Sequence, residues 1–295
     1  MTDDRRAPHP AAARLRELHV LVRCPRCVDG GLLALKLVAT PLTIALVTFI
    51  ERRFGPSVAG LVFGFPLTSS LASVFLAVEQ GPAFARDVTV GLLIGIATFG
   101  VFLASFAHAA ARGLRWPLAL AVALAVYLPT AYGGTLLAGL GRTNAALLGM
   151  LVLGIAAASM PHLPAPAEPR PHGKWELPAR MAIATGLIVL LTAIAARTGP
   201  LLTGVLLLVP ASTSTVTSFV LSRAGPGAAV RLLRGLVWGA FSFVAFFVVA
   251  GNALTTMPTG LAFALAAVAA IGCSGLTWRL AISRHGGQAT DDAVD

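Results

Sequence analysis

Charged residues are scarce in this sequence of 295 residues. Only 12% are Asp, Glu, Lys or Arg, against about 25% in an average soluble domain. Only two of them, Lys36 and Lys174, are lysines. This scarcity excludes a soluble globular enzyme, and the 57% hydrophobic content with a mean hydropathy of +0.83 excludes a disordered chain. The composition predicts a polytopic membrane protein whose main partner is the lipid bilayer.

The charge that is present is mostly positive. The 22 Lys and Arg exceed the 12 Asp and Glu, which gives a net charge of +10 at pH 7. The arginines lie in the first 30 residues and in short gaps between apolar runs, where loops beside anionic lipid are expected. They form no basic stripe on a soluble domain, so we do not expect binding to nucleic acid. The basic tail and the basic loops favour opposite orientations, so the positive-inside rule leaves the orientation open.

Cysteine is scarce as well. Cys24, Cys27 and Cys273 are too few for a disulfide framework. The first two form C-P-R-C, which lacks the two further ligands that a structural zinc site needs. The sequence also contains no H-E-x-x-H, no Asp-rich diphosphate motif, no nucleotide-binding loop and no paired intramembrane carboxylates. We therefore expect no metal site, no cofactor and no enzyme activity.

Apolar runs long enough to cross a bilayer core, about 20 residues each, occur nine times. The expected spans are residues 32–50, 56–78, 88–107, 117–137, 144–160, 178–196, 200–221, 232–250 and 260–282. No stretch alternates apolar and polar residues as a barrel strand does. The sequence therefore predicts an all-α polytopic membrane protein with about nine transmembrane helices.

The spans fall into two halves separated by a proline-rich segment. The predicted organisation is a basic tail (1–30), a first membrane half (31–160), a linker (161–177), a second membrane half (178–282) and a polar tail (283–295). The linker has five prolines, which forbid a continuous helix and favour an extended tether.

The two halves repeat one another. When the chain is shifted by 144 residues, 14 of the 48 positions from 55 to 102 carry the same residue. The matches include two Gly-Pro pairs, a proline inside a span and a GxxxG motif. The first half has five spans, an odd number, so the second copy would start from the opposite side of the membrane. The sequence thus predicts an inverted-topology repeat, a common architecture of secondary transporters.

The second and seventh spans hold the candidate site. Each opens with Gly-Pro, has a proline ten residues after the first one, and closes at another Gly-Pro. An internal proline frees a backbone carbonyl, which hydrocarbon tolerates only when another group bonds to it. Hydroxyl side chains follow both prolines, and interrupted spans at corresponding positions of two halves indicate a transporter's central site. The candidate substrate-binding residues are Pro66, Thr68, Ser69, Ser70, Ser73, Pro210, Ser212, Thr213, Ser214, Thr217 and Ser218. A packed kink without a ligand, its hydroxyls bonded to backbone, is the alternative.

Three charged side chains are candidates for a coupling role. Lys36 lies about five residues into the first span, and Arg180 is its counterpart 144 residues later. Intramembrane charges mark functional sites unless they reach the headgroups by snorkelling. Glu79 ends the second span and is a candidate for carrying a coupling proton, or else a solvated loop charge.

The block G-P-x3-G-x5-P-[LA]-[TS] occurs at residues 55–68 and 199–212. With the duplicated five-helix-like unit, it resembles bacterial inner-membrane proteins of the drug/metabolite-transporter type and GlpM-like membrane proteins, over residues 31–282. The resemblance implies a multi-pass protein of the bacterial cytoplasmic (inner) membrane that exports a small metabolite, driven by a proton gradient. A non-transporting membrane scaffold or envelope-assembly partner is the alternative. The sequence does not determine the cargo, the direction of transport or the oligomeric state.

Overall fold

The computed structural model describes residues 42, 49, 66–137, 139–163, 208 and 210–286. All of them belong to Lys36–Asp295, the second of two units into which the chain divides. The predicted span at 178–196 lies outside the described residues, as does the span at 32–50 apart from Leu42 and Phe49.

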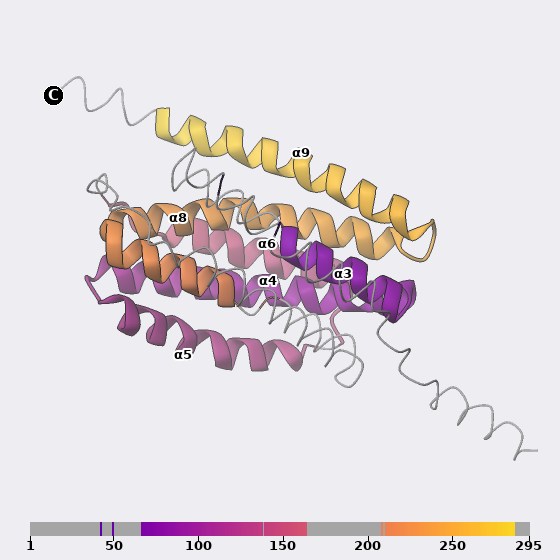
Figure 1. Ribbon diagram of the computed structural model, residues 1–295, viewed down its shortest axis with the longest axis horizontal. Helices are drawn as coiled ribbons and strands as arrows, with labels where there is room; N and C mark the ends of the chain where they lie inside the picture. The colour runs from indigo at the N-terminus through magenta and orange to yellow at the C-terminus, as the bar shows by residue number, and fades with distance from the viewer. Residues whose placement is uncertain are drawn as a thin grey trace, which may run out of the picture. The chain divides into compact units, whose positions relative to one another are not determined.

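The described part of the chain is all-helical (Figure 1). Its helices are α3 (Leu67–Glu79), α4 (Pro82–Ala111), α5 (Trp116–Thr135), α6 (Arg142–Ser159), α8 (Ala211–Ala253) and α9 (Thr259–Gly286). Each of these except α3 contains a stretch long and apolar enough to cross a membrane. For these residues the predicted all-α fold is confirmed, with five helices long and apolar enough to cross a membrane.

Two helices, α4 and α8, extend beyond the boundaries that the sequence predicts. The span predicted at 88–107 is the longer helix α4, because its polar ends, with Arg86, Asp87 and His108, continue the helix beyond the apolar run. The predicted connection between the spans at 200–221 and 232–250 is not a loop but part of α8. A single non-helical residue, Gly225, interrupts α8 there, and Pro226 begins the next helical segment directly, as proline does at a first helical position.

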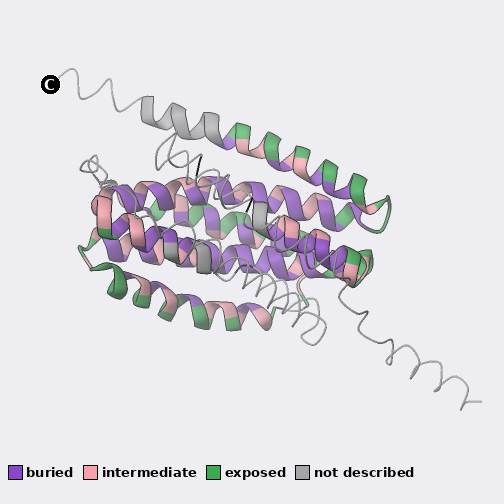
Figure 2. Cartoon of the chain, viewed as in Figure 1, coloured by how far each residue is buried: buried purple, intermediate pink, exposed green. Residues whose placement is uncertain are grey.

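Helix α4 forms the centre of the packing. It contacts α3, α5, α6 and α8, and residues 91–100 are all buried (Figure 2). Its phenylalanines form the middle of the core, where Phe102 stacks on Phe99 and meets Phe106 and Tyr127 edge to face at centroid distances of 6.0–6.4 Å. Aromatic pairs at such distances stabilise a core beyond the area they bury.

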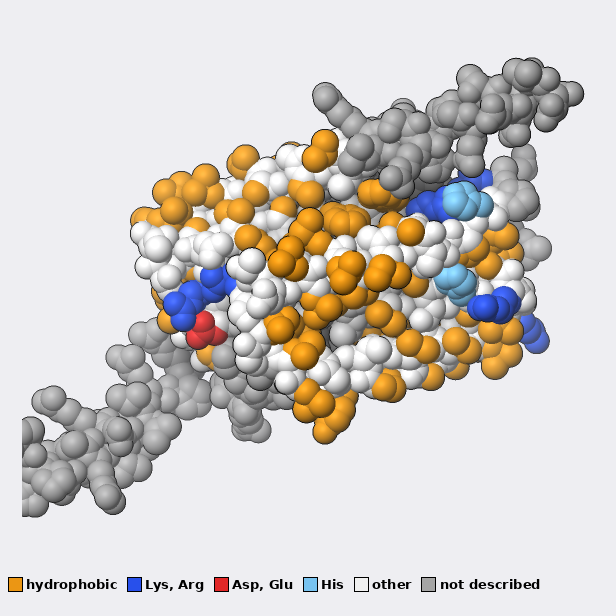
Figure 3. Space-filling view, turned by 180° about the vertical axis from the view of Figure 1, so that it is seen from behind, with side chains coloured by type: hydrophobic (Ala, Val, Ile, Leu, Met, Phe, Trp, Pro, Cys, Tyr) orange, Lys and Arg blue, Asp and Glu red, His pale blue; other side chains and the backbone are white. Residues whose placement is uncertain are grey.

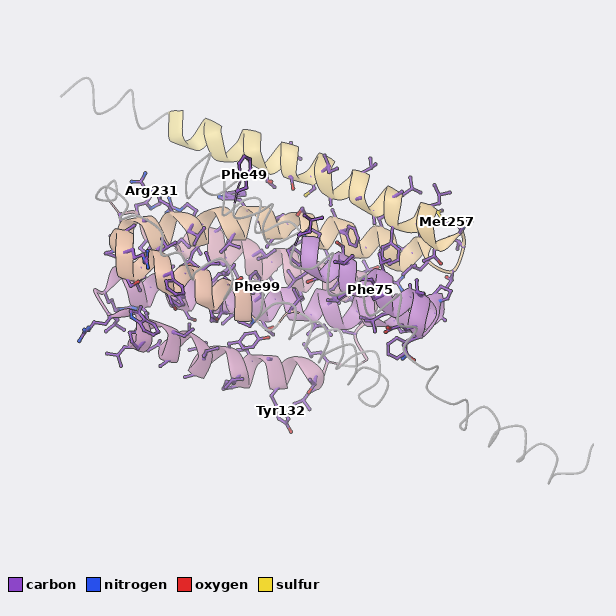
Figure 4. All side chains as sticks on the ribbon, viewed as in Figure 1. Phe49, Phe75, Phe99, Tyr132, Arg231 and Met257 are labelled. Atoms are coloured by element: carbon purple, nitrogen blue, oxygen red, sulfur yellow. The ribbon has the colours of Figure 1, made fainter. Side chains whose placement is uncertain are left out.

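Helices α5 and α9 lie at the margin. Helix α5 packs on α4, and α9 packs on α8. Both leave an apolar face uncovered: on α5, Tyr132 is 72% exposed and points away from the other helices (Figure 4), and on α9, Val268 is 67% exposed. In a membrane protein such faces contact lipid.

One end of the bundle is defined by Arg142, the first residue of α6. Its guanidinium donates hydrogen bonds to Thr89 Oγ1, near the start of α4, at 3.3 Å and to Asn252 Oδ1, near the end of α8, at 2.6 Å. The starts of α4 and α6 and the end of α8 therefore lie together. We call this the Arg142 end.

The opposite end is defined by Arg234 in the second segment of α8. Its guanidinium donates to the carbonyl oxygens of Met160 and Pro161, directly after α6, at 3.1 and 3.0 Å. These carbonyls have no partner within α6, and a cation is favourable at a helix C-terminus. Helices α4 and α6 thus run parallel, and the second segment of α8 runs antiparallel to both. We call this the Arg234 end.

Candidate functional site

The two prolines of the candidate site have the same local geometry. Pro66 precedes α3 with φ −74° and ψ 42°, and Pro210 precedes α8 with φ −78° and ψ 42°. The carbonyl oxygen of Pro66 accepts the backbone N–H of Ser70 at 2.7 Å, and that of Pro210 accepts the N–H of Ser214 at 2.7 Å. Both prolines are buried. Each proline therefore starts a helix inside the protein rather than at a surface loop.

The helical segments that follow these prolines are short, and both end at a glycine with positive φ. Gly81 follows α3 with φ 93° and ψ 160°, and Gly225 interrupts α8 with φ 79° and ψ −179°. The first segment of α8 (residues 211–224) and α3 (13 residues) are each about 20 Å long, too short for a hydrocarbon core of about 30 Å. Both are half-length helices, and each leads through its glycine into a long helix.

Both prolines lie at the level of the middle of the bundle. Helix α3 packs on α4 through the turn at Gly81, so Pro66 lies level with about residue 96 of α4. Figure 1 shows the first segment of α8 folding back in the same way, which puts Pro210 level with about residue 240. Gly149 of α6 faces Ile96 on α4 and Val244 on α8, so the two levels lie within about 6 Å of each other, roughly one helical turn.

The two half-length helices extend from this level to opposite ends. Helix α3 ends at Glu79, directly before the start of α4 at the Arg142 end. The first segment of α8 ends directly before Pro226, which lies beside Ala110 at the far end of α4. The N-terminal ends of both half-length helices therefore point to the middle, where their positive dipole ends favour anionic or carbonyl groups.

The hydroxyls after Pro66 include one that bonds to its own helix. Ser69 and Ser73 are buried, 5% and 2% exposed, and Ser73 Oγ donates to the Ser69 carbonyl at 2.8 Å. Ser70 is half-buried. The Ser73 bond agrees with the packed-kink alternative at this position. The side chain of Thr68 lies outside the described part.

The hydroxyls after Pro210 behave differently. Thr213, Thr217 and Ser218 are buried, with 8%, 0% and 7% exposed, and Ser214 is half-buried. Thr217 Oγ1 and Ser218 Oγ have no hydrogen-bond partner. Thr217 is the counterpart of Ser73, 144 residues later, so the same position is bonded in one half and unsatisfied in the other. A buried hydroxyl without a partner retains its capacity to donate and accept hydrogen bonds. The side chain of Ser212 lies outside the described part.

The charged candidates are not at the prolines. Glu79 is the last residue of α3, half-buried and about 20 Å along that helix from Pro66. Lys36 and Arg180 lie outside the described residues. Asp87, in the first turns of α4, pairs with Arg86 at 2.8 Å, and both side chains are exposed.

The polar cluster at the Arg142 end was not predicted from the sequence. A Cβ added to Gly251 would lie 2.5 Å from both Arg142 Nε and Thr89 Oγ1, so the missing side chain makes room for the guanidinium. The Oδ1 atom of Asn252, the next residue, accepts a hydrogen bond from Arg142. The only sequence signal was the pair Gly251-Asn252 late in an apolar run, and this pair does not indicate which residue Asn252 contacts.

Comparison with protein-family models, with curated proteins and with solved structures finds no match.

Proposed function

We propose that the protein is a secondary transporter or exporter of a small metabolite in the bacterial inner membrane, working by alternating access. The observation that carries the proposal is the pair of half-length helices whose N-terminal ends, at Pro66 and Pro210, lie at mid-level and extend to opposite ends. Interrupted helices of this kind bind substrate near the bilayer midplane in many transporters, because their free N–H groups and dipole ends recognise polar solutes. The unsatisfied hydroxyls of Thr217 and Ser218 supply further donors and acceptors on the same segment.

The proposal includes nine spans arranged as an inverted repeat. The prolines before α3 and α8, the glycines at 81 and 225, and the starts of α4 at Pro82 and of the second segment at Pro226 all lie 144 residues apart. Helix α5 starts at Trp116 and α9 at Thr259, 143 residues later. The antiparallel packing of α4 on the second segment of α8 supports opposite orientations of the two copies.

The resemblance of the sequence to drug/metabolite transporters and GlpM-like proteins is a prediction that belongs to this proposal. A central cavity between residues 66–73 and 210–218 also remains a prediction, because residues 56–65, 200–207 and 209 lie outside the described part.

Thr217→Val tests the site. Valine keeps the shape of threonine and removes the hydroxyl, so the variant should fold and lose one hydrogen bond to the solute. We expect solute uptake to fall about tenfold, the value of one good hydrogen bond. The measurement is uptake into proteoliposomes that hold the full chain and a pH-sensitive dye, screened with amino acids, sugars and organic acids under an imposed proton gradient.

Ser242→Ala is the matched control. Ser242 is also fully buried, but its hydroxyl donates to the Gly239 carbonyl at 2.6 Å within the second segment of α8. Uptake should remain as in the parent protein. An equal loss of uptake in both variants would contradict a specific role of Thr217.

A non-transporting scaffold is the second candidate, favoured by the bond from Ser73 to its own helix. It predicts no uptake of any solute. Thr217→Val should raise the melting temperature in detergent under both candidate functions when no solute is present, because an unsatisfied buried hydroxyl costs about 1–3 kcal/mol.

A further inference from the structure

A hollow of about 400 Å³ opens at the Arg234 end, between the turn that joins α4 to α5 and the kink of α8. The turn contributes Gly113, Leu114, Arg115 and Trp116, and the kink contributes Leu221 and Ser222. Arg115 is exposed, and Trp116 is 46% exposed. The hollow thus combines a cationic side chain, an indole and apolar walls at one end of a membrane helix bundle.

The end that holds this hollow is strongly basic. The arginines placed there by the turn and by the second segment of α8 are Arg112, Arg115, Arg231 and Arg234. Figure 4 labels Arg231 at this end and Met257 at the other. Of the residues that the structure describes, only Glu79 and Asp87 are acidic, and both lie at the Arg142 end.

Figure 3, seen from behind, shows this contrast. Arginine and histidine side chains gather at one side of the molecule, and arginines next to an acidic side chain lie at the opposite side. The Arg142 end is balanced, since Arg86 and Arg142 are offset there by the two carboxylates. The field at the Arg234 end therefore attracts anions.

An apolar stripe leads away from the hollow along α5. Leu120, Leu124 and Leu128 follow Trp116 at intervals of four residues, so they share one helix face with it. Leu128 is 63% exposed, and Leu120 and Leu124 are half-buried. Indoles such as that of Trp116 anchor at the interface between headgroups and acyl chains. A free anion would use the arginine alone, whereas a phospholipid would use the arginine, the indole and the stripe.

We propose that this hollow binds an anionic phospholipid, whose phosphate pairs with Arg115 while an acyl chain lies along the stripe on α5. Basic pockets between membrane helices bind acidic headgroups in this way, and the cytoplasmic leaflet is the anionic one. A cytoplasmic location of the Arg234 end agrees with the positive-inside rule for the loops at this end. The proposal requires a membrane-embedded bundle but not transport, so it can fail or hold independently of the proposed function.

The test is titration of the purified full-length protein in detergent with dioleoylphosphatidylglycerol or dioleoylphosphatidylcholine, with apparent dissociation constants from native mass spectrometry. Phosphatidylglycerol should bind more tightly. Arg115→Gln should weaken its binding about fivefold, the value of one arginine near an anionic surface. Arg115→Lys keeps the charge and should retain most of the affinity.

Arg86→Gln is the control, because it removes an arginine from the Arg142 end and should leave the affinity unchanged. Melting temperatures establish that each variant is folded. Equal affinities for the two lipids, or equal effects of Arg115→Gln and Arg86→Gln, would overturn the proposal. So would displacement of the lipid by millimolar inorganic phosphate, which would assign the hollow to a soluble anion instead.

Discussion

Gly149→Val is expected to lower the free energy of unfolding by about 2 kcal/mol, as overpacking of a tight interface does. Gly149 lies on α6 where this helix meets both α4 and α8. A Cβ at this position would lie 3.3 Å from the carbonyl oxygen of Leu93, and 3.6 and 3.7 Å from methyl groups of Ile96 and Val244. The carbonyl belongs to the buried backbone of α4 and cannot move aside as a flexible side chain can. The two further methyl groups of valine therefore force the helices apart.

The measurement is denaturation of the full chain in mixed detergent micelles, followed by helix content. Gly154→Val is the matched control, because Gly154 is on the same helix and a Cβ there would meet nothing within 4 Å. Both variants carry the same change in helix propensity, so the difference between their free energies of unfolding measures the effect of packing alone. Equal stability of the two variants would show that α6 does not approach α4 this closely.

Gly225→Ala is also expected to lower the free energy of unfolding by about 2 kcal/mol. Unlike Gly149→Val, it strains the backbone and displaces no neighbouring atom. Gly225 has φ 79° and ψ −179°, a conformation that only glycine adopts readily. An added Cβ would meet nothing within 4 Å, so the expected loss comes from the backbone alone. Gly81→Ala should cost a similar amount, because Gly81 has φ 93° and ψ 160° and equally open surroundings.

Gly272→Ala on α9 is the control for this pair. A Cβ there also meets nothing within 4 Å, but the residue is helical, so alanine should stabilise by roughly 0.5–1 kcal/mol. In the same denaturation experiment we therefore expect glycine-to-alanine changes at these two positions to shift the free energy of unfolding in opposite directions. If Gly225→Ala and Gly272→Ala both stabilised the protein, the turn between the two segments of α8 would be wrong.

The interrupted segments could be located from the sequence because proline and glycine act locally. Pro66 and Pro210 interrupt the helical hydrogen bonding, so each predicts a break within its span. The Gly-Pro pairs at 81 and 225 indicate where one helix ends and the next begins. The full lengths of the spans predicted at 56–78 and 200–221 stay predictions, because their first halves lie outside the described residues.

The tertiary contacts could not be predicted in the same way. Nothing near Gly149 distinguishes it in sequence from Gly154, since only the position of α4 makes one of them indispensable. The bond between Arg142 and Asn252 joins residues 110 positions apart and depends on the antiparallel packing of α6 and α8. The difference in hydrogen bonding between Ser73 and Thr217 could not be predicted either. Both are small hydroxyl side chains after a proline, and they differ mainly in the residues that surround them.

The antiparallel pairing of α4 with the second segment of α8 has a consequence for the origin of the chain. If the two halves descend from one gene, its unduplicated product could form this contact only between two separate molecules inserted in opposite directions. Such a dual-topology ancestor needs arginine shared almost evenly between its ends, since any bias would fix one direction. Fusion of the copies removes that requirement, and arginine is then free to accumulate at one end, as it has beside Arg234 among the described residues.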